Sequence, residues 1–154
     1  MVGGSSANAL PAAIVRIVLD TNVLLTSLGR TSPARPIFDA LRTGRVALAV
    51  TTDILLEYAE IIERETTPAI SANVVSLLLN LPKTVRVEVS YRLNLIHADQ
   101  DDDKFADCAF AANADWIVTN DKHFQLLASV DFPQLNVISE QEFVRLLQSI
   151  SSSV

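Results

Sequence analysis

The chain has 154 residues, of which 49% are hydrophobic, and it carries a formal net charge of −6 and one cysteine. This length fits one domain with a sizeable core of its own, and a lone cysteine excludes an intramolecular disulfide. The negative charge argues against a simple basic nucleic-acid-binding protein. An acidic chain can still be a nuclease if much of its negative charge lies in a metal site.

The two ends differ in composition from the rest of the chain. Residues 1–13 are mostly small and uncharged, and they lack the basic and apolar regions of a signal peptide. We expect a flexible leader at 1–13, one domain at 14–148 and a frayed serine-rich tail at 149–154. No apolar run approaches the roughly 18 residues of a transmembrane helix. Nothing requires an oxidising compartment, so we expect a cytoplasmic protein with no membrane segment.

Short hydrophobic runs alternate with helical patterns along the chain. In chain order the prediction is strand 15–19, a polar turn and apolar stretch 21–28, loop 29–36, helix 37–42 closed by Gly44, strand 46–50, helices 54–62 and 71–79 with Pro68 breaking the pattern between them, strand 85–89, helix 99–112, strands 116–119 and 136–138, and helix 143–147 behind a capping box at 139–142. This alternation predicts an α/β fold with a parallel sheet and helices on both faces.

Acidic residues stand where strands end or helices begin. Asp20 and Asp121 come directly after predicted strands, the run 101–103 opens a helix, and Glu57 lies in the first turns of another. Sites in open parallel sheets form beyond the carboxyl ends of the strands. Each residue taken singly could be a turn residue, a helix cap or a solvated surface residue. Together they predict four acidic positions on one rim.

Clustered carboxylates repel one another, and a divalent cation removes that penalty. Ligation by oxygen alone suits Mg²⁺ or Mn²⁺ rather than Zn²⁺. Such ions activate water and neutralise charge on a phosphodiester. The predicted rim is therefore a candidate for metal-dependent phosphodiester hydrolysis.

Four motifs carry a resemblance to a known family. They are Val-Leu-Asp-Thr-Asn-Val at 18–23, Leu-Leu-Glu-Tyr at 55–58, Asp-Gln-Asp-Asp-Asp-Lys-Phe at 99–105 followed by Ala-Asp-Cys-Ala, and Ile-Val-Thr-Asn-Asp at 117–121. In order and spacing the chain resembles the PIN-domain family, and within it the toxins related to VapC, from about residue 14 to 147. Each motif alone is weak, and the four in order are specific.

The resemblance implies a PIN-like three-layer α/β/α fold with a mainly parallel sheet, and a ribonuclease that uses one or two Mg²⁺ or Mn²⁺ ions. By motif position Asp20, Asp102 and Asp121 would ligate metal directly, with Asp103 as a possible substitute for Asp102. Glu57 would ligate metal or hold the attacking water.

Neighbouring residues would support these carboxylates. Thr21 and Asn22 would order the loop and bond Asp20, and Thr119 would do the same beside Asp121. Asn120, in the same loop, stands where many family members carry glycine, and Gln100 where many carry proline; neither difference touches a proposed ligand.

The resemblance also implies partners: a single-stranded RNA substrate, an antitoxin protein and a second copy of the chain in a homodimer. The apolar helices 54–62 and 74–79 fit either the core or such a protein surface. Scattered basic residues fit either an RNA groove or plain surface: Arg30, Arg35, Arg42, Arg45 and Lys104.

Two other functions compete with the ribonuclease. A catalytically silent PIN-fold module that only binds a partner protein would have lost an acidic ligand, and all four are present. A phosphatase of the haloacid dehalogenase type needs a second aspartate two residues after the first, where this chain has Asn22. That mismatch counts strongly against the phosphatase.

Overall fold

The computed structural model describes residues 14–89, 100–124 and 135–152, and for 100–103 and 151–152 it describes the backbone alone. The leader at 1–13 lies outside these ranges. In chain order the elements are β1 (Val15–Leu19), α2 (Thr21–Ser27), α3 (Arg35–Arg42), β2 (Val46–Val50), α4 (Thr52–Glu65), α5 (Pro68–Leu79), β3 (Val85–Arg86), α6 (Gln100–Ala111), β4 (Trp116–Val118), β5 (Val137–Ile138) and α7 (Glu140–Ser152).

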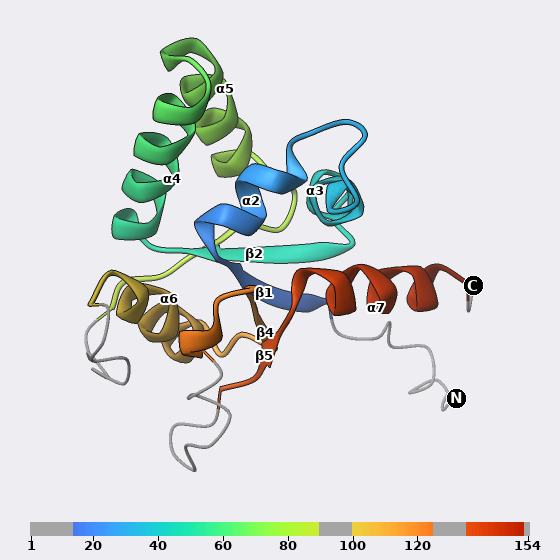
Figure 1. Ribbon diagram of the computed structural model, residues 1–154. Helices are drawn as coiled ribbons and strands as arrows, with labels where there is room; N and C mark the ends of the chain where they lie inside the picture. Colours follow the sequence, from blue (N-terminus) through green and yellow to red (C-terminus); the bar gives the residue numbers. More distant parts are fainter. Residues whose placement is uncertain (1–13, 90–99, 125–134, 153–154) are drawn as a thin grey trace, which may run out of the picture.

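The strands form one sheet in the order β3-β2-β1-β4-β5, and every described strand pair is parallel. All five residues of β2 are buried, as are Ile17–Leu19 of β1, because central parallel strands are covered on both faces. Helix α6 packs against β1, β2 and β4, whereas α3 packs against β2, α2 and α7 (Figure 1). The predicted three-layer α/β/α fold is confirmed.

Helices α4 and α5 form a hairpin arm that extends from the sheet (Figure 1). Thr51 and Thr67 cap the two helices through their side-chain oxygens, which accept hydrogen bonds from backbone N–H groups three residues on. Pro68 occupies the first turn of α5, where its missing N–H costs nothing, so it starts that helix and does not merely interrupt a pattern. None of the helices in the described ranges is long and apolar enough to cross a membrane.

Three predicted boundaries are wrong. Residues 21–27 form a helix rather than a turn and an apolar stretch, because Asp20 caps it. Helix α3 begins at Arg35, inside the predicted loop, since proline is tolerated at the start of a helix. Strand β3 has two residues rather than five, because its partner β2 ends at Val50.

The last helix is also longer than predicted. It begins at Glu140 and continues to Ser152, so the expected frayed tail from 149 is helical for most of its length. The sequence from 139 onward contains no glycine or proline to stop it. Ser139 makes the predicted capping box, in which its Oγ accepts from the backbone N–H of Glu142 at 3.1 Å and donates to that residue's Oε1 at 2.9 Å.

Candidate metal-binding site at the carboxyl edge of the sheet

Asp20 lies at the point where β1 ends and α2 begins. Its backbone N–H donates to the carbonyl oxygen of Val118 at 3.1 Å, which fixes the residue against β4. Its Oδ1 accepts from the N–H of Asn22 at 3.4 Å, and its Oδ2 accepts from the hydroxyl of Thr119 at 2.7 Å. The carboxylate is therefore held by donors from two segments that are distant in sequence.

Thr119 links the two loops that carry the aspartates. Its side chain is buried, and its Oγ1 accepts a hydrogen bond from the N–H of Asp121 at 3.0 Å while donating to Asp20. Asp121 in turn accepts from the backbone N–H of His123 at 2.9 Å. The Thr119 hydroxyl thus links the Asp20 and Asp121 loops, in addition to the backbone hydrogen bond from Asp20 to Val118.

The environment of Asp20 disfavours its charged form. Burial is the largest cause of the raised pKa of its carboxyl, and the negative charges of Asp121 and then Glu57 raise the pKa further. Hydrogen bonds from Thr119 and Asn22 work in the opposite direction and offset part of the shift. A nearby cation would favour the ionised carboxylate.

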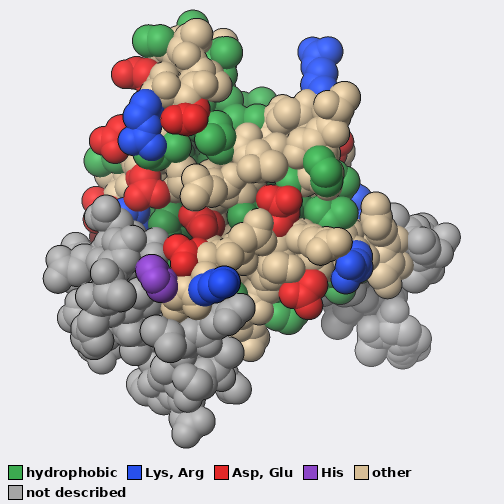
Figure 2. Space-filling view, viewed as in Figure 1, with side chains coloured by type: hydrophobic (Ala, Val, Ile, Leu, Met, Phe, Trp, Pro, Cys, Tyr) green, Lys and Arg blue, Asp and Glu red, His purple; other side chains and the backbone are tan. Residues whose placement is uncertain are grey.

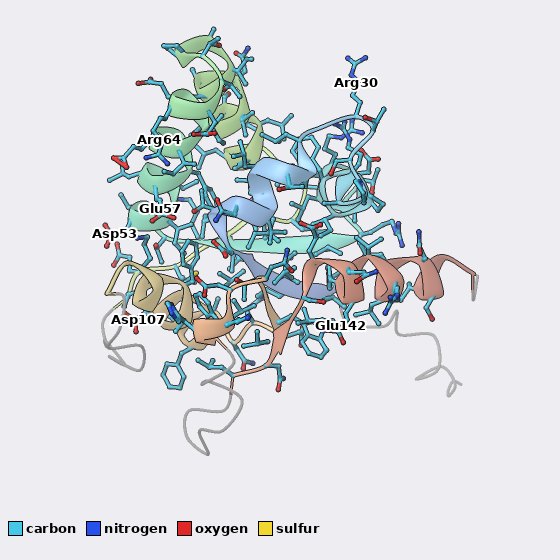
Figure 3. The ribbon with its side chains drawn as sticks, viewed as in Figure 1. Arg30, Asp53, Glu57, Arg64, Asp107 and Glu142 are labelled. Carbon is cyan, nitrogen blue, oxygen red and sulfur yellow. The ribbon has the colours of Figure 1, made fainter. Side chains whose placement is uncertain are left out.

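Glu57 reaches the site from α4 and is held by two side chains. The hydroxyl of Thr21 donates to Oε2, and the Nζ of Lys104 lies 2.7 Å from Oε1. In Figure 3 Glu57 lies at the end of α4 that faces α6, and Asp107 is carried by α6. Asp107 is almost fully buried and lines a second pocket together with Lys104 and Asp53.

Asp20 and Asp121 line a pocket of about 260 Å³. Its lining comes from three stretches of chain at this edge of the sheet, namely Asp20, Asn22, Val23 and Thr26, then Asn120 and Asp121, and finally Glu140. Figure 2 shows acidic side chains on the face where α2, α4 and α6 meet. The predicted positions Asp20 and Asp121 are therefore neighbours at one rim.

Two contributors to this rim were not identified in the sequence. Glu140 lines the pocket, and burial raises the pKa of its carboxyl. Its N–H donates to Asn120 Oδ1 at 3.0 Å, which joins α7 to the Asp121 loop. Glu140 follows β5, so the rule that selected Asp20 and Asp121 could have found it.

Tyr58 is fully buried and donates to the carbonyl of Leu19, next to Asp20, at 2.6 Å.

The third predicted ligand remains a prediction. Asp102 and Asp103 lie in the first turn of α6, one turn or less before Lys104, but their side chains fall outside the described part. Among the side chains that the structure does describe, no three His, Cys, Asp or Glu residues converge closely enough to hold a metal ion. Mg²⁺ commonly binds through one or two carboxylates and keeps several waters, so the oxygen donors of Asp20 and Asp121 fit this ion.

The fold and this rim define a parallel α/β domain with an acidic pocket at the carboxyl edge of its sheet. The family model for the PIN domain matches residues 16–123, which include both aspartates and Glu57. The chain belongs to the PIN-domain family.

Solved structures with the same fold come from VapBC complexes. The chain is similar to one in VapBC2 of Rickettsia felis bound to a DNA fragment from their promoter, with a TM-score of 0.58, 15% identity, and coverage of 81% of this chain and 98% of that one. It is also similar to chains in DNA-bound VapBC of Salmonella typhimurium (TM-score 0.57) and in VapBC-1 of nontypeable Haemophilus influenzae (TM-score 0.56), each at 17% identity with coverage of 82% and 98%. Comparison with curated protein sequences finds no match.

Proposed function

We propose that this protein is a divalent-metal-dependent endoribonuclease that hydrolyses single-stranded RNA. The observation that carries the proposal is the Asp20–Asp121 pair, which faces one pocket and is joined through the hydroxyl of Thr119. Membership of the PIN-domain family supports a nuclease. A bound Mg²⁺ or Mn²⁺ would polarise the phosphodiester and supply a water of lowered pKa.

The chain's own groups would orient this chemistry. Asp20 and Asp121 would hold the ion, with Asp102 as a further ligand by motif position. Thr119 keeps Oδ2 of Asp20 fixed by a hydrogen bond, which lowers the reorganisation needed on binding. In-line attack of water would leave a 5′-phosphate and a 3′-hydroxyl.

Cleavage of a mixed single-stranded RNA tests the proposal. The purified chain should cleave with Mg²⁺ or Mn²⁺, stop in EDTA, and lose activity in Asp20→Asn. Glu60→Gln is the matched control, because Glu60 is exposed on α4, three residues from Glu57. If wild type and Asp20→Asn are equally inert on varied RNAs and on DNA, the catalytically silent binding module is the better account.

We further infer that the chain is a toxin whose antitoxin contacts the α4–α5 arm. The VapBC neighbours support an antitoxin partner. On α5 only Ser71 and Leu78 are buried, although the helix is mostly apolar, and Leu56 of α4 is 64% exposed. Co-expression with the protein encoded beside this gene should give a complex that Leu56→Asp weakens. If light scattering shows no mass beyond that of this chain or its homodimer after co-expression, the inferred antitoxin complex is contradicted. The same measurement tests the expected homodimer.

A further inference from the structure

The ion pair between Lys104 and Glu57 joins α6 to α4 inside the site. The Nζ–Oε1 distance is 2.7 Å, and the two side chains are only 17% and 22% exposed. The other oxygen, Oε2, accepts from the hydroxyl of Thr21. Both oxygens of Glu57 are thus engaged by donors from two other elements, and one of those donors carries a full positive charge.

Asp20 and Asp121 are held in a different way. Their hydrogen bonds come from the hydroxyl of Thr119 and from backbone N–H groups. The imidazole Nδ1 of His123 lies 3.6 Å from Oδ1 of Asp121. They line one pocket with Glu140, whereas Lys104 lines another pocket with Asp107. The lining of the Asp20–Asp121 pocket does not include Glu57, and no three described ligands converge on one ion.

We propose that Lys104 is a positioning residue that keeps Glu57 out of the metal's coordination shell, so that the site takes one divalent ion, held by Asp20 and Asp121 with Asp102 as the further ligand expected from motif position. This inference rests on the proposed function. The ammonium of Lys104 and a divalent ion bound to the same Glu57 carboxylate would repel each other strongly, because the Lys104 and Glu57 side chains are largely removed from water. Removing the ammonium would leave Glu57 as an uncompensated carboxylate, which is a ligand for a second ion.

The test is Mn²⁺ binding to the full-length chain, measured through the electron paramagnetic resonance signal of free Mn²⁺. Wild type should bind one ion. Glu57→Gln should still bind one ion, with a Kd within about threefold of the Glu60→Gln control, whereas Asp121→Asn should weaken binding by about tenfold or more. Lys104→Met should bind a second Mn²⁺ ion, whereas Lys104→Arg, which keeps the positive charge, should bind one ion as wild type does.

Some results would overturn this inference and leave the metal site intact. Two ions on wild type would refute the one-ion site, and a loss in Glu57→Gln as large as in Asp121→Asn would make Glu57 a direct ligand. A Lys104→Met chain that folds by circular dichroism and binds only one ion would also refute it. If Lys104→Met does not fold, Glu57→Gln decides the question alone. Wild type that binds no Mn²⁺ would overturn the proposed metal site together with this inference, whereas Mn²⁺ binding without RNA cleavage would reject only the ribonuclease.

Discussion

Replacing Thr119 with valine removes one hydroxyl and tests how the two aspartate loops are joined. Valine has nearly the same shape, and Thr119 is only 3% exposed, so the change is chiefly the loss of two hydrogen bonds. The first, to Oδ2 of Asp20 at 2.7 Å, goes to a charged group, and such bonds contribute about 1.5–3 kcal/mol. The second comes from the N–H of Asp121, whose loss costs about 1 kcal/mol or more if water does not replace it.

We therefore expect Thr119→Val to lower the free energy of unfolding by about 2–4 kcal/mol in EDTA. In a domain of this size that corresponds to a fall in Tm of roughly 5–15 °C. Thr119→Ser is the matched control, because it keeps the hydroxyl and loses one methyl group, at a cost of about 0.8 kcal/mol. Urea and thermal unfolding of the three chains would measure both effects.

The destabilisation caused by Thr119→Val should also depend on pH. The Thr119 hydroxyl favours the ionised form of Asp20 and so lowers a pKa that burial raises. A raised folded pKa means that the wild-type stability contributed by Asp20 is present at low pH and is lost as pH rises through that pKa. Without the hydroxyl this loss becomes larger, so Thr119→Val should be more destabilising at neutral pH than in acid. If Thr119→Val costs no more than Thr119→Ser, or costs the same at every pH, then Thr119 does not support the ionised site.

Asp20→Asn should raise Tm in EDTA at neutral pH, because it removes a buried charge next to other carboxylates. In excess Mg²⁺ wild type should have the higher Tm, because the ion stabilises only wild type. Equal increases in the Tm of both chains on adding Mg²⁺ would contradict this. Tyr58→Phe should cost about 1–3 kcal/mol in urea unfolding, by leaving the buried carbonyl of Leu19 without its 2.6 Å donor, and should slow RNA cleavage. Thr67→Ala should cost about 1 kcal/mol as a lost cap of α5 and leave cleavage unchanged; reduced cleavage would mean that the arm affects the site. Burial raises the pKa of Cys108 to about 12, so Ellman's reagent at pH 8 should react only with unfolded protein.

The sequence predicted best the features that depend on local pattern. The strands at 15–19 and 46–50 were found with their observed bounds because a predominantly apolar run, broken only by Arg16 in the first strand, suits a strand covered on both faces. Asp20 and Asp121 were placed at one edge by a rule of parallel sheets, and the structure puts both on one pocket. The boundaries that failed depend on the neighbouring chain: β3 stops where β2 ends, and α2 forms because the Asp20 carboxylate caps it.

The residues that the sequence missed act through tertiary contacts. Lys104 looked like one of several scattered basic residues, and its pairing with Glu57 follows only from the packing of α6 against α4. Tyr58 belongs to the apolar stripe of α4. The helical periodicity of that stripe does not predict that the Tyr58 hydroxyl donates to the carbonyl oxygen of Leu19, the residue before Asp20. Glu140 was absorbed into a capping box, although it also follows a strand at the same edge.

The carboxylates of this site therefore differ in the groups that surround them. Hydroxyl and amide donors orient Asp20 and Asp121, whereas burial and, after it, the negative charges of Asp121 and Glu57 raise the pKa of the Asp20 carboxyl. Glu57 is compensated by the ammonium of Lys104. A cation that enters the pocket gains most beside Asp20 and Asp121, which have no lysine or arginine partner among the described ion pairs, so the position of one lysine, rather than the number of carboxylates, would decide how many ions the site holds.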